Sequence, residues 1–238
     1  YNTGTKYGLV DLERIISALT FSPDGCIAIK PKGVIAIEHF LILRNIMYRS
    51  IYNHRINEIC TWILENIFKK IRSEFNNKIW IDECMKRWIF SPKSLDVKNF
   101  LSNDDIRLYY HLNKWKDDAP EPISILCEMF MNRNLLKAVN INFLSNLDKL
   151  ELLAFARKKA NKLNVDPTLF CGIKEKNFNG FESNNSLKVW NGNTLKELDK
   201  ESSLIKILIQ NQENSLLIYP SCIQTDISEE IIKLKEKI

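Results

Sequence analysis

The sequence predicts a mostly helical protein, with a helical body over residues 1–165 and a small α+β subdomain over residues 166–238. The body is indicated by the stretch from Val34 to about Phe75, where apolar residues recur at helical spacing. The subdomain is indicated by "NNSLKVWNGNTLKEL" (184–198), in which an Asn-Gly turn separates two strand-like runs and favours a β-hairpin. With 45% hydrophobic and 26% charged residues, the 238-residue chain has the composition of a globular protein with a sizeable core.

The first thirty residues predict a loop, a helix and a strand. "TGTKYG" (3–8) reads as a loop, and Asp11 is the candidate N-cap of a helix over "LERIISAL" (12–19). "SPDG" (22–25) is a turn signal before the strand-like "CIAIK" (26–30), and "PKG" (31–33) turns again. These signals fit either a short hairpin or a single strand with a return.

The helical pattern of residues 34–75 fits one helix of roughly 40 residues or two helices in line. Further helices are predicted over residues 79–90, 104–115, 122–139 and 146–164, with a loop at "DDAPEP" (117–122). In the tail, "ESSLIKILIQ" (201–210) predicts a helix and "SLLIYPS" (215–221) a strand. "SEEIIKLKEKI" (228–238) predicts a last helix with Ser228 as its N-cap.

Charge and cysteine usage narrow the class of protein only loosely. The net charge of +5 suits an anionic small ligand as well as nucleic acid. The six cysteines are scattered without a Cys-x-x-Cys pair, so we expect reduced, mostly buried thiols in a cytoplasmic protein and no zinc site of the finger type. No apolar stretch is long enough for a membrane span and no signal-peptide pattern opens the chain.

The segment "RNIMYRSIYNHR" (44–55) combines arginines, tyrosines and a histidine in an unusual density. At helical spacing one face carries Arg44, Tyr48, Ile51, Tyr52 and Arg55. Arg44 and Tyr52 would lie roughly 12 Å apart along the axis, about the reach of a nucleoside triphosphate from phosphate to sugar. Arginine offers a planar fork of donors to phosphate, a tyrosine ring can pack on a sugar, and Asn53 could bond a ribose hydroxyl.

A purely structural interpretation of this segment is also open. In it Tyr48, Ile51 and Tyr52 pack in the core while Arg44, Arg49 and Arg55 extend into solvent. A second basic set is looser, and each member alone fits a surface charge: Arg14, Lys30, Lys32 and, far downstream, Arg133.

The sequence contains no complete catalytic motif that we can identify. Its three histidines, His39, His54 and His111, form no His-x-x-x-His pair, and none precedes an aspartate. "WNGNT" is a hairpin turn rather than a phosphate-binding loop, and no Gly-x-Ser-x-Gly elbow occurs.

Two segments resemble the HD-domain phosphohydrolases, and most closely their dGTPase-like, dNTP triphosphohydrolase branch. They are "YNTGTKYGLVDLERII" and "IEHFLILRNIMYRSIYNHR", and "NRNLLKAV" (132–139) is similar to that family's Arg-Asn-Leu-x-Lys segment. The resemblance implies the C-terminal part of a multi-helical HD-type body. Because the chain starts at Tyr1 just past the family's Arg-Asp step, we expect the part that carries the metal ligands to precede it.

The implied reaction is hydrolysis of a deoxynucleoside triphosphate to the deoxynucleoside and triphosphate. In that family a divalent or transition metal organises the attack as a Lewis acid and water activator. We assign no metal ligand and no catalytic residue within this chain, and we expect these residues alone to be inactive. A homo-oligomer, dimer or tetramer, is also implied.

Substrate-binding residues follow from the same resemblance. Arg44 matches the arginine on the triphosphate, and Tyr52 matches the tyrosine that packs on the deoxyribose, where a ribose 2′-hydroxyl would clash. Asn53 stands where relatives carry Gln, a polar partner of the sugar. The positions that hold regulatory nucleotide phosphates between subunits in tetrameric relatives match Arg14, Lys30, Lys32, Arg55 and Arg133.

Two other classes stay open. A helical nucleic-acid-binding module could use the same basic helix, and would bind with a steep salt dependence and little preference for free nucleotides. A degenerate HD protein could serve as a scaffold.

Overall fold

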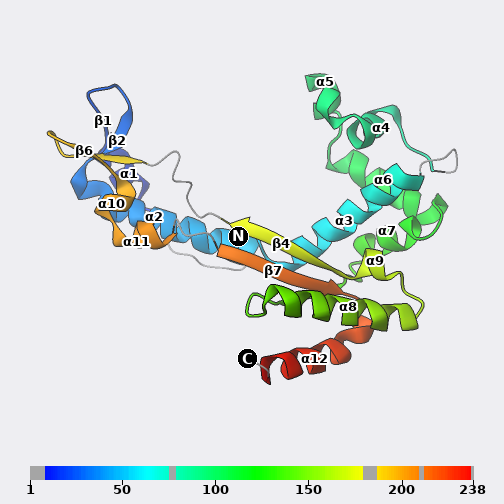
Figure 1. Cartoon of the computed structure of the whole chain (residues 1–238). Coiled ribbons are helices and arrows are strands. Elements are labelled where there is room, and N and C mark those ends of the chain that lie inside the picture. Colours follow the sequence, from blue (N-terminus) through cyan, green and yellow to red (C-terminus); the bar gives the residue numbers. More distant parts are fainter. Residues whose placement is uncertain (1–8, 75–78, 179–186, 209–211, 237–238) are drawn as a thin grey trace. The chain divides into compact units, whose positions relative to one another are not determined.

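The computed structural model describes residues 9–74, 79–178, 187–208 and 212–236. It confirms a mostly helical fold with small sheets (Figure 1). The chain forms two compact units that alternate along the sequence: Tyr1–His54 with Glu175–Ser215, and Arg55–Lys174 with Leu216–Ile238. The sequence predicted two consecutive domains, 1–165 and 166–238, so the observed units are divided at other residues.

The first unit combines a four-stranded sheet with helices from both parts of the sequence. Asp11 caps the first helix as predicted, because its carboxylate accepts from the Arg14 backbone N–H at 3.0 Å. The sheet has the order β1-β2-β5-β6, in which β1 and β2 form a hairpin across the "SPDG" turn. The elements are α1 Leu12–Ala18, β1 Leu19–Phe21, β2 Ile27–Ile29, the 3-10 turn η1 Pro31–Gly33, α2 Val34–Met47, β5 Lys188–Trp190, β6 Leu195–Glu197, α10 Leu198–Glu201 and α11 Ser203–Leu208.

The core of this unit joins residues that are far apart in the sequence. Ile37 and Leu41 on α2 are buried against Leu198 and Ile205, which belong to α10 and α11. The predicted hairpin of residues 184–198 is confirmed in its described part, where β5 and β6 pair antiparallel. Helix α2 therefore owes its apolar support to residues more than a hundred positions downstream.

The long helical pattern of residues 34–75 is two separate helices, and not one helix of roughly 40 residues. Helix α2 ends at Met47, a π-helical turn η2 spans Tyr48–Tyr52, and α3 runs over Arg55–Glu74. In the π turn the Asn53 backbone N–H donates to the Tyr48 carbonyl five residues earlier, at 2.8 Å. The boundary between the two units falls directly after this turn, between His54 and Arg55.

The second unit is a helical body joined to a three-stranded sheet in the order β3-β7-β4. Helices α8 and α12 pack on one face of that sheet (Figure 1), where Leu152, Leu217 and Ile227 are buried together. A second core surrounds Ile63 and Trp115. The elements are α4 Glu83–Phe90, the 3-10 turn η3 Pro92–Ser94, α5 Val97–Leu101, α6 Asp105–Asp118, α7 Ile123–Met131, β3 Lys137–Asn140, α8 Asn146–Lys162, α9 Pro167–Phe170, β4 Gly172–Phe178 as far as Lys174, β7 Gln212–Tyr219 from Leu216 on, the 3-10 turn η5 Ser221–Ile223 and α12 Gln224–Glu236.

Three sequence predictions are wrong in detail. The helix expected over 122–139 ends at Met131, because residues 137–140 pair with β7 as strand β3. The last helix begins at Gln224, so Ser228 lies inside it and bonds the Gln224 carbonyl at 3.0 Å instead of capping. The cysteines form no disulfide, but only Cys127 and Cys171 are buried.

Candidate functional site

A row of three side chains runs along α2 and the π turn that follows it. The guanidinium carbon of Arg44 lies 4.8 Å from the centre of the Tyr48 ring, a cation–π contact. The Tyr48 and Tyr52 rings are 5.0 Å apart with an interplanar angle of 44°. The side chains of residues 44, 48 and 52 thus contact one another in the order of the sequence, as their spacing predicted.

The arginine–tyrosine row (Arg44, Tyr48 and Tyr52) forms part of the lining of a cleft of about 230 Å³. The rest of the lining is apolar and consists of Val10, Phe40, Leu43 and Met47. The cleft is smaller than the roughly 300 Å³ at which pockets for whole drug-sized ligands begin. Its size and its single cation suit one part of a ligand, a sugar or base held against apolar walls with an anionic group at Arg44.

The structural interpretation of this segment is wrong for its tyrosines. Tyr48 and Ile51 are half-buried, and Tyr52 is 53% exposed. Arg44 is itself half-buried, whereas Arg49 is exposed and does not line this cleft. The row is accordingly accessible within the described part of the chain.

Asn53 is not part of this cleft. Its backbone N–H closes the π turn onto Tyr48, and its half-buried side chain is absent from the lining. The structure therefore brings together two of the three predicted substrate-binding residues, Arg44 and Tyr52, and adds Tyr48 between them.

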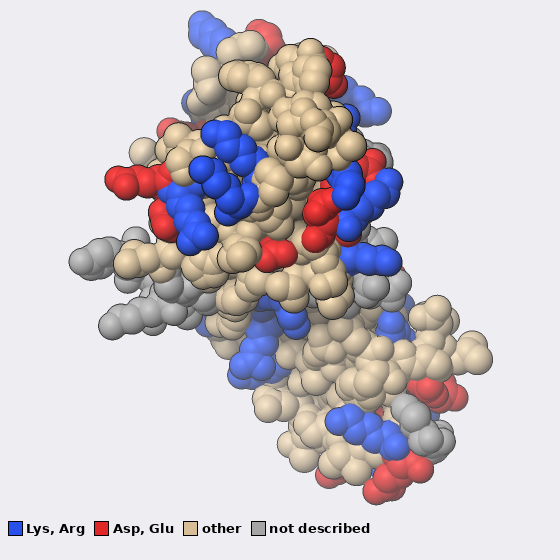
Figure 2. Space-filling view, turned by 90° about the vertical axis from the view of Figure 1, so that its left-hand side faces the viewer, with Lys and Arg blue, Asp and Glu red and all other residues tan. Residues whose placement is uncertain are grey.

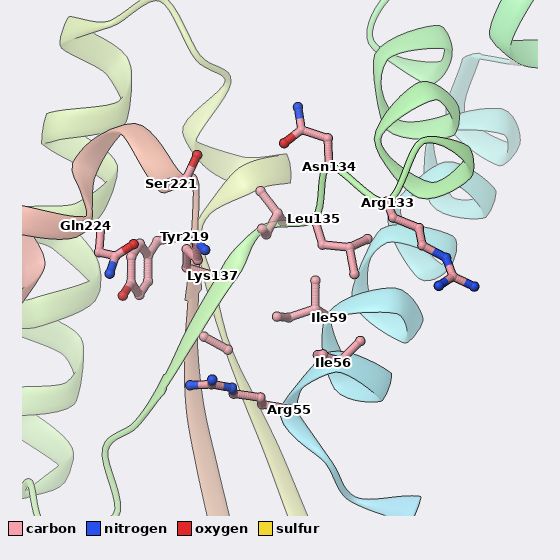
Figure 3. A pocket seen from close by; sticks show the side chains of 12 residues that line it. Arg55, Ile56, Ile59, Arg133, Asn134, Leu135, Lys137, Tyr219, Ser221 and Gln224 are labelled. Atoms are coloured by element: carbon pink, nitrogen blue, oxygen red, sulfur yellow. The ribbon is translucent and has the colours of Figure 1, made fainter. Parts of the chain in front are cut away.

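The second unit contains a larger pocket, of about 470 Å³, with three cationic side chains (Figure 3). Arg55 and Arg133, which are far apart in the sequence, both line it, as does Lys137. Its remaining lining is Ile56, Ile59, Asn134, Leu135, Leu136, Ala138, Tyr219, Ser221 and Gln224. We call it the cationic pocket.

The cations occupy two sides of this pocket. In Figure 3 the Arg55 guanidinium points toward the side where Tyr219 and Lys137 lie, and the Arg133 guanidinium lies on the other side, past Ile59. The charge of Arg55 also acts on Tyr219, which agrees with their placement on the same side of the pocket. Burial raises the pKa of the Tyr219 phenol, and the positive charge of Arg55 acts in the opposite direction.

The three cations of the pocket have no carboxylate partner within the part of the chain that the structure describes. Among the described residues Arg55, Arg133 and Lys137 form no salt bridge. A cavity with three such cations and the hydrogen-bonding groups of Tyr219 and Gln224 is suited to a polyanion with a polar organic part.

Sequence reasoning missed part of this pocket. Lys137 lies within the quoted "NRNLLKAV", four residues after Arg133, and that spacing could have singled it out. Tyr219 had no local signal, because it reaches the pocket through strand pairing: Lys137 and Tyr219 are directly opposite each other on β3 and β7.

The other predicted basic residues lie in the first unit and line neither cleft: Arg14, Lys30 and Lys32. Arg14 and Lys32 are exposed, and the Lys30 ammonium donates to the Ser17 carbonyl at 3.3 Å.

The described residues offer neither a cluster of metal ligands nor a membrane-spanning helix. They contain no group of three or more His, Cys, Asp or Glu side chains placed to hold a metal ion. His111 is fully buried, with its Nδ1 2.9 Å from the Arg107 carbonyl and its Nε2 accepting from the Asp82 N–H. None of the described helices combines the length and apolarity needed to cross a membrane.

Comparison with known families gives a match over most of the chain. The family described as "HD associated region" matches residues 10–226. The uncharacterized protein YwfO of Bacillus subtilis is 28% identical over 144 residues, 60% of this chain and 33% of that protein. An uncharacterized protein of Methanocaldococcus jannaschii is 35% identical over 112 residues, 45% of this chain and 21% of that protein.

Two solved structures share the fold. A phosphohydrolase from Bacteroides thetaiotaomicron has a TM-score of 0.68 at 21% identity, over 90% of this chain and 56% of that one. A hypothetical protein from Aquifex aeolicus has a TM-score of 0.67 at 21% identity, over 96% of this chain and 53% of that one. The chain thus spans a third or less of the two curated relatives and just over half of these two solved chains.

Proposed function

Since the chain belongs to the HD-associated-region family, we propose that it is the substrate-binding part of an HD-type phosphohydrolase that converts deoxynucleoside triphosphates to deoxynucleoside and triphosphate. The observation that carries this proposal is the arginine–tyrosine row along the 230 Å³ cleft. Arg44 binds the triphosphate through charge-assisted hydrogen bonds, and Tyr52 packs on the deoxyribose. Asn53 is proposed only as a polar partner that must turn toward the cleft.

The proposed reaction includes a divalent or transition metal ion. The described residues do not offer a ligand set for one, so no metal ligand and no step through the metal is assigned to this chain. What its own residues supply is binding: a half-buried cation for the phosphates and an apolar wall with an aromatic ring for the nucleoside. A cytoplasmic homo-oligomer remains part of the proposal.

The test is hydrolysis of dGTP by the intact protein with added Mg²⁺ or Mn²⁺, measured as release of deoxyguanosine and triphosphate. Arg44→Ala removes hydrogen bonds to a charged group, and kcat/KM should fall about 10- to 100-fold. Arg49→Ala is the matched control, because this exposed arginine on the same helical segment lines neither cleft. Equal kcat/KM for Arg44→Ala and Arg49→Ala would show that the role given to Arg44 is wrong.

For the cationic pocket we propose a regulatory nucleotide whose phosphates contact Arg55, Lys137 and Arg133. The presence of two arginines that are distant in the sequence in the lining of one 470 Å³ pocket supports this. Arg14, Lys30 and Lys32 would have to contribute from a neighbouring subunit, as the resemblance implies. In an Arg44→Ala background, residual dGTP binding should weaken about tenfold with Arg55→Ala. It should be unchanged with Lys93→Ala, an exposed lysine that lines neither cleft. If Arg55→Ala and Lys93→Ala change residual dGTP binding equally, the proposal of a regulatory nucleotide in this pocket is refuted.

The nucleic-acid alternative is less well supported. On the face seen in Figure 2, Lys and Arg side chains lie in separate groups, several of them beside Asp or Glu side chains. Nucleic-acid-binding surfaces more often present a continuous basic stripe. Binding of single-stranded DNA that exceeds dGTP binding and falls steeply between two salt concentrations would favour this alternative instead. Tight dGTP binding without hydrolysis, whichever metal ion is added, would favour the alternative of a degenerate HD protein that serves as a scaffold.

A further inference from the structure

Tyr48 is the central member of the arginine–tyrosine row, and the proposed function gives it no role. Its ring centre lies 4.8 Å from the Arg44 guanidinium carbon and 5.0 Å from the centre of the Tyr52 ring. It also lines the 230 Å³ cleft, where it is half-buried. Its ring is therefore the contact shared by both proposed substrate-binding residues.

We propose that Tyr48 is a positioning residue that holds the Arg44 guanidinium at the phosphate end of the cleft. This inference rests on the proposed function, because it assigns to Tyr48 a role that acts through Arg44. The ligand concerned is a deoxynucleoside triphosphate, bound by its phosphates at Arg44.

The first reason is the chemistry of the contact. Arginine has a long side chain with high rotamer entropy, and it loses that freedom when it binds an anion. An aromatic face attracts the guanidinium electrostatically, so it restricts the side chain before the ligand arrives. Unlike a carboxylate, the ring carries no negative charge, so the ring itself does not neutralise the guanidinium that the phosphates would contact.

The second reason is the backbone at this position. The π turn begins at Tyr48, and the Tyr48 carbonyl accepts from the Asn53 N–H at 2.8 Å. An isolated π turn costs helix stability and is found often at functional sites. Tyr48 and Tyr52 are the first and last residues of this turn, their rings are 5.0 Å apart, and Tyr52 is 53% exposed.

The third reason is the apolar surround. Phe40, Leu43 and Met47 line the same cleft as the row. Apolar walls reduce the local dielectric, which strengthens a cation–π contact relative to one in open solvent. The hydroxyl of Tyr48 is not needed for any of this, so a phenylalanine should serve as well.

The test is a double-mutant cycle on dGTP affinity, measured by equilibrium binding to the intact protein without catalytic metal. Tyr48→Leu should weaken dGTP binding roughly 3- to 20-fold, the range expected for a partly desolvated cation–π contact. Tyr48→Phe keeps the ring and should bind within twofold of wild type. In the Arg44→Ala background Tyr48→Leu should have almost no further effect, because Tyr48 acts through Arg44.

The outcomes separate the inference from the function on which it rests. If Arg44→Ala leaves dGTP binding unchanged, the proposed function and this inference both fail. If Arg44→Ala weakens binding but Tyr48→Leu does not, only the positioning role is refuted. If Tyr48→Leu weakens binding equally with and without Arg44, its effect is a general one on the fold, and the inference is overturned. Thermal unfolding of each variant identifies loss of folding, and Tyr48→Phe still tests the ring in that case.

Discussion

Replacing Arg133 by glycine should make the protein more stable and weaken its binding of anions. Arg133 follows α7 in the left-handed region, with φ at +55°, a conformation that favours glycine at helix ends. A long side chain there costs about 1 kcal/mol relative to glycine. The Arg133 N–H offsets little of that cost, because its contact with the Phe130 carbonyl is 3.4 Å long. Retention of arginine at a strained position in a cationic pocket is consistent with a binding role.

Arg133→Gly should therefore raise the free energy of unfolding by about 1 kcal/mol, and Tm by about 3 °C for a chain of this length. Urea unfolding followed by circular dichroism and differential scanning calorimetry measure these changes. Asn164→Gly is the matched control, because Asn164 has φ at +56° at the end of α8, but asparagine tolerates that region. Asn164→Gly should raise the free energy of unfolding by at most a few tenths of a kcal/mol. If Arg133→Gly lowers the free energy of unfolding, or raises it no more than Asn164→Gly does, the argument from backbone strain at Arg133 is refuted.

The remaining predictions concern the buried parts of the second unit. Gly172→Ala should cost about 2 kcal/mol by urea unfolding, since its Cβ would lie 2.0 Å from the Trp62 ring; an unchanged midpoint would contradict this. Burial raises the pKa of the Cys127 thiol to about 12, so the stability it contributes is present below the unfolded value near 9.0 and is lost as pH rises toward 12. Between pH 9 and 11 the free energy of unfolding of Cys127→Ala should fall less steeply than that of wild type, by roughly 1 kcal/mol per pH unit, and parallel curves would refute the assignment. His111→Ala should cost about 3 kcal/mol, because it leaves a cavity and an unpaired Asp82 N–H; a loss below about 1 kcal/mol would not fit.

Local patterns predicted those elements whose causes are local. The capped helix after Asp11 and the Asn-Gly hairpin near residue 192 were recovered because caps and tight turns depend on a few adjacent residues. The helical reading of residues 132–139 failed because β3 forms by pairing with β7, about eighty residues downstream. Apolar residues such as Leu135 and Leu136 fit either state until the pairing partner is known.

The same distinction holds for the candidate sites. Arg44 and Tyr52 could be paired from the sequence because a four-residue repeat places side chains over one another on a helix. The π turn between them was not predictable, since it is set by backbone hydrogen bonds rather than by side-chain type. Tyr219 entered the cationic pocket only through the fold.

The alternation of the two units along the chain sets a condition on how the protein can be shortened. A chain cut after residue 165 would keep α1 and α2 but lose α10 and α11, whose Leu198 and Ile205 bury Ile37 and Leu41. The helix that carries Arg44 would then expose its apolar face to water, with aggregation as the expected result. The ribosome makes α2 long before α10 and α11. During synthesis this helix therefore cannot complete its packing until residue 205 and its neighbours have emerged.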